Sequence, residues 1–223
     1  MVQTGRSTLM FEFLDACKLD GCPVCRLITS SVRRFFDTLT YENTNDPGIR
    51  ADLRGSRGFC NRHAWQYADY RDGLGTAILY RDVLREVLRL LHGASDEPLE
   101  FLSRAAEHLL DPAGSHERDR LLRDLAPDSP CMVCSQEDTS SQNIIDAFLR
   151  RLDEPDVVPA IAASSGLCRT HFREAIDVAR QPARRSRLVS AQRIAWHGVQ
   201  ERVGSGDSTA AGDMLVGHPG VFS

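Results

Sequence analysis

The chain has 223 residues, of which 42% are hydrophobic and 26% charged, as is typical of a folded protein with one large domain or two small ones. Its formal net charge of -4 indicates no general attraction to nucleic acid or to an anionic membrane surface. No apolar run reaches the roughly eighteen residues of a membrane span, and acidic residues interrupt the apolar N-terminal stretch, which is untypical of a signal peptide. We therefore expect a cytoplasmic protein without a membrane segment, in which seven cysteines serve metal or redox roles rather than disulfides.

The first third of the chain predicts helices around a CxxC motif formed by Cys22 and Cys25. Residues 8–19 are expected to form a short leader helix before the motif. A long helix follows it, because apolar residues recur there at the three- and four-residue spacing of a buried helical stripe. The stripe consists of Val24, Leu27, Ile28, Val32, Phe35, Phe36 and Leu39. No segment alternates apolar and polar residues over a length sufficient for a sheet, so we expect an all-α protein.

Two short helices are predicted where proline stands at a first helical position. Pro47 starts a helix that ends near residue 54, and Pro155 starts one that ends near residue 163. Gly58 and Gly166 supply the turns that follow. Beyond each glycine, a further helix carries a CxxH pair in its first turn, the two pairs being Cys60 with His63 and Cys168 with His171.

The segments between and after these motifs are also predicted to be mainly helical. Amphipathic helices are expected over 73–91 and 97–110. Residues 112–130 are rich in proline and hold a hinge with a short helix over 117–125. From residue 204 the chain lacks periodicity and is rich in Gly and Ser, which predicts a flexible C-terminal tail that is either disordered or weakly docked.

The chain repeats itself, and the repeat includes every cysteine but one. The first copy reads C-x2-C-x34-C-x2-H and the second C-x2-C-x33-C-x2-H. The residues concerned are Cys22, Cys25, Cys60 and His63 in the first copy, and Cys131, Cys134, Cys168 and His171 in the second. This register predicts a tandem duplication, with a first helical unit over 7–111, a second over 112–203 and the tail over 204–223. We expect the two units to pack as one pseudo-twofold body.

Each copy supplies three cysteines and one histidine, the donor set of a closed tetrahedral zinc site. We expect each unit to close its own site, with two zinc ions per chain. The same ligands could also hold an iron–sulfur cluster, which is the alternative. A thioredoxin-like dithiol leaves Cys60 and His63 unexplained, and Arg26 and Ser135 stand where covalent haem attachment requires histidine. Cys17 has no cysteine partner in the other copy and is expected to be a core residue or a free thiol.

The rest of the sequence carries no signature of an enzyme. A closed four-ligand site has no position for activated water, and the chain carries no HExxH, nucleophile-elbow or glycine-rich phosphate motif. The arginines at 184, 185 and 187 are expected on a solvated helix face rather than on nucleic acid. Trp65, Tyr67 and Tyr70 are expected to pack the first CxxH helix against its neighbour.

Three segments carry a resemblance to a known family. They read "CPVC", "YENTNDPGIRADLRGSRGFCNRHAW" and "DGLGTAILYRDVL". Together they are similar to a bacterial family of unknown function with a twofold CPxC and GFCxxH arrangement, over about residues 8–203. The resemblance implies that the eight cysteine and histidine ligands are the family's defining residues, and it implies no activity. The second copy here reads "CMVC", without the proline.

These observations lead to a functional expectation with two alternatives. We expect a zinc-stabilised helical binding or scaffold protein with a protein or small-molecule partner. An iron–sulfur or thiol redox sensor is the first alternative, and a nucleic-acid-binding regulator is the second.

Overall fold

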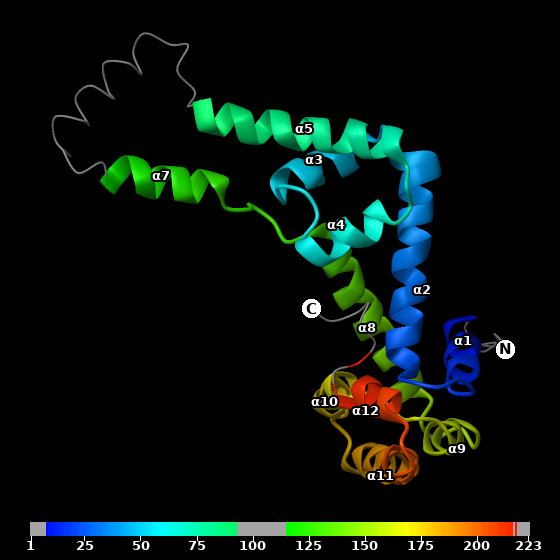
Figure 1. Ribbon diagram of the computed structural model, residues 1–223. Coiled ribbons are helices and arrows are strands. Elements are labelled where there is room, and N and C mark those ends of the chain that lie inside the picture. The colour runs from blue at the N-terminus through cyan, green and yellow to red at the C-terminus, as the bar shows by residue number, and fades with distance from the viewer. Residues whose placement is uncertain (1–7, 93–114, 216, 218–223) are drawn as a thin grey trace, which may run out of the picture. The chain divides into compact units, whose positions relative to one another are not determined.

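The computed structural model describes residues 8–92, 115–215 and 217, and within these residues it is helical without strands (Figure 1). The expected all-α fold is confirmed. The α-helices are α1 (Thr8–Ala16), α2 (Pro23–Thr38), α3 (Pro47–Gly55), α4 (Asn61–Ala68), α5 (Gly73–His92), α7 (Ser115–Leu125), α8 (Met132–Arg150), α9 (Val157–Ala163), α10 (Arg169–Val178), α11 (Pro182–Gly204) and α12 (Ser208–Leu215). A π-helical turn over Leu39–Asn43 continues α2. The helix expected over 97–110 lies outside the described residues.

The helix order repeats as the sequence predicts. A long helix, a short helix, a CxxH helix and a second long helix follow each other as α2, α3, α4 and α5, and again as α8, α9, α10 and α11. Proline opens α3 at Pro47, whereas α9 begins at Val157, two residues after the predicted start. None of the described helices is long and apolar enough to cross a membrane.

Contacts divide the chain into two compact units that differ from the two sequence repeats. The terminal unit comprises residues 1–35 and 136–223, and the central unit comprises residues 36–135. The predicted boundary near residue 111 therefore separates the repeats but not the units. How the units pack, including the expected pseudo-twofold arrangement, stays a prediction.

Aromatic side chains form the core of the central unit around Phe36. Its ring centroid lies 5.6 Å from that of Phe59 and 5.5 Å from that of Tyr67. Tyr67 is buried, and Tyr70 joins the same cluster. Trp65 is 72% exposed, so the expectation of packing is wrong for this residue, which points away from the core on α4.

The core of the terminal unit includes an aromatic stack and a helix–helix contact. Phe13 of α1 stacks on Phe148 of α8 with ring centroids 4.8 Å apart. The short helix α9 packs along α11, and Ile161 and Leu188 on these helices are fully buried. Burial of this apolar surface supplies the main driving force for the unit to fold.

The C-terminal segment is more ordered than the sequence suggested. Residues 208–215 form α12, which packs against α11 and α10, so this part of the tail is helical and docked rather than disordered. The Gly- and Ser-rich composition gave no helical signal, because this helix has little amphipathic pattern of its own. Tertiary contacts stabilise it. Its N-terminus is fixed in part by Asp207, whose carboxylate accepts a hydrogen bond from the backbone N–H of Ala210 at 3.2 Å.

Candidate metal centres

The eight predicted ligands gather into two groups, but each group draws on both repeats. The terminal centre consists of Cys22, Cys25, Cys168 and His171, and the central centre consists of Cys60, His63, Cys131 and Cys134. In each group the candidate ligand atoms all lie within 4.8 Å of one another. The expectation that each repeat closes its own site is therefore wrong. The CxxC pair of one repeat meets the CxxH pair of the other.

The length of α2 explains the exchange. Cys25 lies in its first turn and Phe36 in its last, and eleven residues of α-helix rise by roughly 16 Å. Phe36 packs against Phe59, the residue directly before Cys60. The helix therefore carries the chain away from Cys25 before the first repeat reaches its own CxxH pair.

Every ligand pair begins a helix. Cys60 and Cys168 are the N-cap residues of α4 and α10, with φ and ψ of -62° and 164° at Cys60 and -64° and 163° at Cys168. Cys22 and Cys131 directly precede α2 and α8, and their carbonyls accept the first helical hydrogen bonds, from Arg26 and Ser135. Sulfurs placed at helix N-termini meet unpaired N–H groups and the positive end of the helix dipole, which favour the thiolate form.

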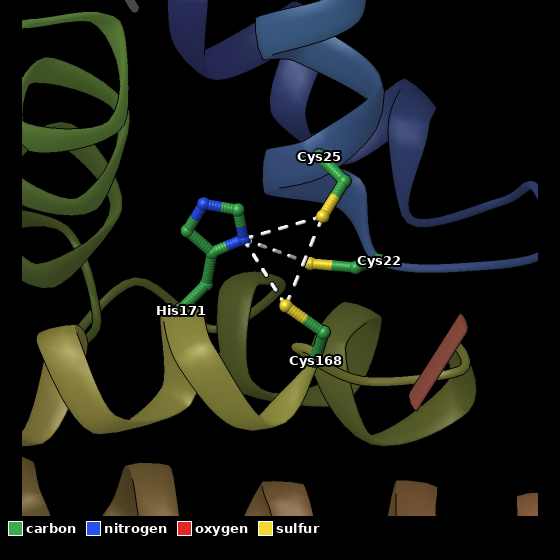
Figure 2. Close-up of side chains that lie close together, drawn as sticks. All are labelled: Cys22, Cys25, Cys168 and His171. Atoms are coloured by element: carbon green, nitrogen blue, oxygen red, sulfur yellow. Dashed lines mark hydrogen bonds between the residues drawn. The ribbon is translucent and has the colours of Figure 1, made fainter. Parts of the chain in front are cut away.

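In the terminal centre the imidazole of His171 faces three sulfurs (Figure 2). Its Nδ1 lies 3.6 Å from Sγ of Cys22, 3.3 Å from Sγ of Cys25 and 3.3 Å from Sγ of Cys168. The sulfurs of Cys25 and Cys168 are 3.8 Å apart. The other ring nitrogen points away from the sulfurs.

The central centre has the same arrangement. Nδ1 of His63 lies 3.2 Å from Sγ of Cys60, 3.6 Å from Sγ of Cys131 and 3.4 Å from Sγ of Cys134. The sulfurs of Cys60 and Cys134 are 3.7 Å apart.

These spacings fit one tetrahedral ion in each centre. With zinc–sulfur bonds of about 2.3 Å and zinc–nitrogen bonds of about 2.0 Å, a tetrahedron has edges of about 3.8 Å between sulfurs and about 3.5 Å between sulfur and nitrogen. The sulfur–sulfur distances of 3.7 and 3.8 Å match the first value. The sulfur–nitrogen distances of 3.2 to 3.6 Å lie around the second. Two Cys3His groups in the described part of the chain could therefore each hold a metal ion.

Residues 10–192 match a family described as a family of unknown function, DUF6062. The chain belongs to this family. The resemblance seen in the CxxC and GFCxxH motifs is thus confirmed, and both candidate centres lie within the matched residues.

One curated relative and the solved structures complete the comparison. The chain is 38% identical over 72 residues to an "Uncharacterized 23.9 kDa protein in xynA 3'region" of Caldicellulosiruptor sp. (strain Rt8B.4). The match covers 32% of this chain and 35% of the relative, so it spans about a third of the relative's length. No solved structure matches the chain.

The thiols of this DUF6062 chain differ in their readiness to lose a proton. Burial tends to raise the pKa of Cys131, but hydrogen bonding to His63 and to backbone amides outweighs it and lowers that pKa to about 6. Burial and the neighbouring charge of Cys131 raise the pKa of Cys134 to about 12. In the terminal centre, hydrogen bonds from Cys22 and Cys25 lower the pKa of Cys168, whereas burial raises that of Cys22 to about 12. The raised pKa values of Cys22 and Cys134 keep these thiols protonated without a cation, so a bound metal is needed to hold three thiolates in either centre.

The two centres differ in exposure. In the terminal centre all four ligands are buried, with Cys22 at 5% and Cys25, Cys168 and His171 at 1% exposure. In the central centre His63 and Cys131 are buried, but Cys60 and Cys134 are partly exposed. Cys17 is buried, belongs to neither group, and has its pKa raised to about 12 by burial, as suits a core thiol.

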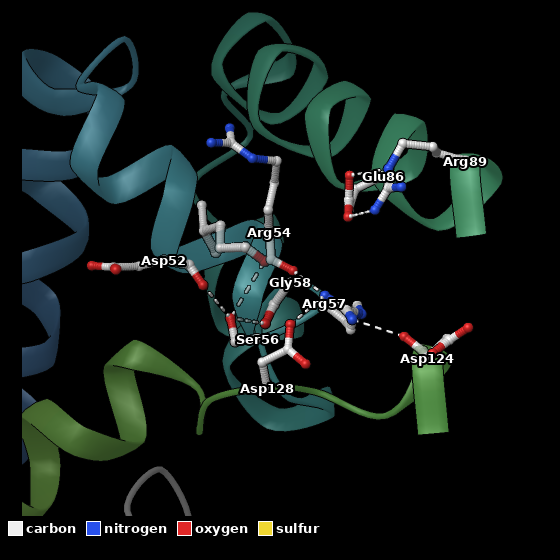
Figure 3. A network of polar contacts seen from close by, with 10 residues as sticks. Asp52, Arg54, Ser56, Arg57, Gly58, Glu86, Arg89, Asp124 and Asp128 are labelled. Carbon is white, nitrogen blue, oxygen red and sulfur yellow. Dashed lines mark hydrogen bonds and ion pairs between the residues drawn. The ribbon is translucent and has the colours of Figure 1, made fainter. Parts of the chain in front are cut away.

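Arg57 is a structural residue of the central centre that the sequence did not single out (Figure 3). Its guanidinium donates hydrogen bonds to the carbonyl of Arg54 at 2.9 Å and to that of Asp124 at 2.8 Å, and it pairs with Asp128 at 3.2 Å. The backbone N–H of Asp128 also donates to the carbonyl of Gly55 at 2.8 Å. These contacts join the turn before Cys60 to the segment that leads to the CxxC pair of the second repeat.

The predicted basic cluster is partly neutralised within the fold. Arg184 lies 3.1 Å and Arg187 2.5 Å from the carboxylate of Asp153. Exposed pairs of this kind contribute little to stability, but they reduce the positive potential available to a polyanion.

Proposed function

We propose that the protein is a zinc-stabilised helical scaffold, with one structural zinc ion in each centre. The observation that carries this proposal is the closed donor set, in which three sulfurs and one nitrogen lie within 4.8 Å of one another in both centres. Four protein ligands complete a tetrahedron around zinc and leave no position for a reacting water, which is typical of a structural site.

The compactness of each donor set favours zinc over a polynuclear iron–sulfur cluster. The cysteines of such a cluster bind different iron atoms around a core of several atoms, so their sulfurs are spread apart. Sulfur–sulfur distances of 3.7 and 3.8 Å suit a single ion instead. Zinc also accepts mixed thiolate and imidazole ligands without a strong geometric preference beyond the tetrahedron.

The exchange between repeats makes the proposed zinc ions long-range cross-links. Cys25 and Cys168 are 143 residues apart, and His63 and Cys131 are 68 residues apart, with the second pair nested inside the first. A cross-link restricts the unfolded chain more when it closes a longer loop. Metal binding is therefore expected to stabilise both units and to hold together segments that are distant in sequence.

We also propose that the scaffold binds a partner through exposed apolar residues, as a cytoplasmic protein. Leu84 and Leu88 of α5 are 58% and 50% exposed, and with Tyr80 they line an open groove of about 500 Å³. Ligand sets of free thiols suit a reducing compartment. Replacing both leucines with glutamate should leave the zinc content unchanged. The variant should no longer retain a binding partner that the wild-type chain retains.

Elemental analysis of protein purified without oxygen tests the proposed metal. We expect two zinc ions per chain, no visible absorption band, and a lower melting temperature after treatment with EDTA. Iron with inorganic sulfide would overturn the zinc assignment in favour of a cluster protein. Metal-free protein with an unchanged melting temperature would overturn the structural role.

A further inference from the structure

We propose that Cys60 and Cys134 form a peroxide-sensitive pair, which hydrogen peroxide oxidises to a disulfide with loss of the central zinc ion, while the terminal centre keeps its zinc. This inference rests on the proposed zinc occupancy and adds a modification site to it. Its basis is that two centres with the same donor set differ in how far their sulfurs reach solvent.

In each centre the candidate sulfurs lie within 4.8 Å of one another. Sγ of Cys60 lies 3.7 Å from Sγ of Cys134, and Sγ of Cys25 lies 3.8 Å from Sγ of Cys168. A disulfide bond is about 2.05 Å long, so the sulfurs of Cys60 and Cys134 and those of Cys25 and Cys168 must approach by a similar distance for either bond to form. Sulfur–sulfur distance therefore does not separate the centres.

Exposure does separate them. Cys60 and Cys134 are both partly exposed, whereas Cys25 and Cys168 are each 1% exposed. Oxidation of cysteine follows thiolate character together with access to the oxidant. Both sulfurs of the central pair satisfy the second requirement, and a bound zinc ion supplies the thiolate form in either centre.

The helix α12 adds to the cover of the terminal centre. Thr209, Asp213 and Met214 line a cavity of about 180 Å³ together with Cys22 and Cys168. The helix α12 also packs against α11 and against α10, the helix that carries His171. Although this cavity borders Cys22 and Cys168, the two side chains are only 5% and 1% exposed, so a dissolved oxidant has little access to their sulfurs.

The oxidation balances without a further reactant. One thiolate attacks an oxygen of hydrogen peroxide, the O–O bond breaks, and a sulfenic acid and hydroxide form. The second thiolate attacks that sulfur, the S–O bond breaks, and a second hydroxide leaves as the S–S bond forms. Two thiolates thus lose two electrons, peroxide gains them, and the two hydroxides take protons from solvent to become water. Zinc then retains only His63 and Cys131 as ligands and dissociates.

The disulfide would keep the cross-link that the zinc ion had provided. Cys60 is the N-cap of α4, and Cys134 lies in the first turn of α8, so the new bond joins the same two helices. The central unit is therefore expected to lose its metal without losing the connection between these segments.

The test uses the full zinc-loaded chain, treated with increasing hydrogen peroxide in the presence of a chromogenic zinc chelator. We expect one zinc equivalent per chain to be released several-fold faster than the second, and peptide mapping after alkylation to find the Cys60–Cys134 disulfide. Two outcomes overturn the inference: release of both zinc ions at one rate, or a first disulfide that joins Cys131 to Cys134 or any two terminal cysteines. Neither outcome contradicts the proposal that the zinc ions are structural. Protein purified without zinc overturns both.

Two variants sharpen the result. Cys134→His keeps a four-ligand Cys2His2 set that zinc accepts, but it removes one sulfur of the pair. Its first zinc equivalent should leave several-fold more slowly than in the wild type, and an unchanged rate would count against the pair. The control Cys17→Ser alters a buried thiol outside both centres and should release zinc at the wild-type rate. If Cys134→His does not hold two zinc ions, disulfide mapping of the wild type and of Cys17→Ser decides the question.

Discussion

Arg57 and Ser165 stand at the same position of the two repeats, 108 residues apart, and each holds the segment that leads to the CxxC pair of the other repeat. Arg57 donates to the carbonyl of Asp124, seven residues before Cys131. Ser165 accepts a hydrogen bond at 3.1 Å from the backbone N–H of Gly21, directly before Cys22. The turn before each CxxH pair thus positions the ligands that complete its centre.

The first prediction concerns this positioning role. Arg57→Ala removes hydrogen bonds from a charged group that is 14% exposed, so we expect the free energy of unfolding to fall by about 2 kcal/mol. Zinc should also leave the central centre faster when a chelator is added, while the terminal centre releases it at the wild-type rate. Thermal unfolding and stopped-flow zinc transfer measure these two effects.

Arg89→Ala is the matched control for Arg57→Ala. Arg89 is 57% exposed and pairs with Glu86 on its own helix, so its removal should leave the free energy of unfolding almost unchanged. If the two variants behave alike, the contacts of Arg57 do not position the centre.

The eight ligands could be predicted from the sequence, but their pairing could not. Two copies of the same spacing identify the residues, because chance seldom repeats three cysteines and a histidine in register. The same pattern is equally compatible with pairing within a repeat and between repeats. The choice depends on the length of α2 and on where Phe36 packs, which are tertiary properties that no motif encodes.

The roles of Arg57 and Ser165 and the helix α12 could not be predicted, for different physical reasons. Arg57 and Ser165 share a position but no chemistry, so the alignment of the repeats gave no sign of a common role. The helix α12 has little amphipathic pattern, and its stability comes from α10 and α11. By contrast, α3 could be predicted nearly to the residue, since Asp46 and Pro47 provide a local start signal that the structure uses.

The second prediction tests the exchange of ligands by zinc stoichiometry. Cys60→Ser and Cys131→Ser affect the same centre, so the double variant should lose one zinc ion per chain. Cys22→Ser and Cys60→Ser lie in one repeat but in different centres, so that double variant should lose both ions. Native mass spectrometry counts the metal, and the reverse pattern would show that each repeat closes its own site.

The third prediction concerns the pH dependence of zinc affinity at the terminal centre. At pH 7 the lowered pKa of Cys168 leaves that thiol ionised in the metal-free fold, whereas the pKa of Cys22 is raised to about 12 and that of Cys25 is also raised. Zinc must therefore displace two protons from this centre. Because protons compete with the metal, affinity should rise with pH, by about 100-fold per unit around pH 7.

Calorimetry in buffers of different ionisation enthalpy measures the protons released. A chain carrying Cys60→Ser and Cys131→Ser isolates the terminal centre for this purpose. Release of two protons per zinc ion agrees with a centre preformed in the metal-free fold. Release of three would show that all its thiols are protonated before the metal binds, which contradicts the lowered pKa of Cys168.

The fourth prediction compares two glycines at equivalent positions before the CxxH pairs. Gly58 has φ of +96° and Gly166 has φ of +74°, so alanine at either position costs about 1 kcal/mol of backbone strain. A Cβ atom at Gly58 meets no atom closer than 3.7 Å, but one at Gly166 lies 2.6 Å from the side-chain amide nitrogen of Gln192.

That amide makes two hydrogen bonds to the backbone of Leu167, at 3.0 and 2.9 Å, directly before Cys168. Gly166→Ala must displace Gln192 and break these buried bonds, so we expect it to lower the free energy of unfolding by about 2 kcal/mol more than Gly58→Ala. It should also weaken zinc binding at the terminal centre, because the turn that places Cys168 loses its support. Denaturant unfolding of the two zinc-loaded variants makes the comparison, and equal losses would mean that Gln192 moves aside without consequence for the centre.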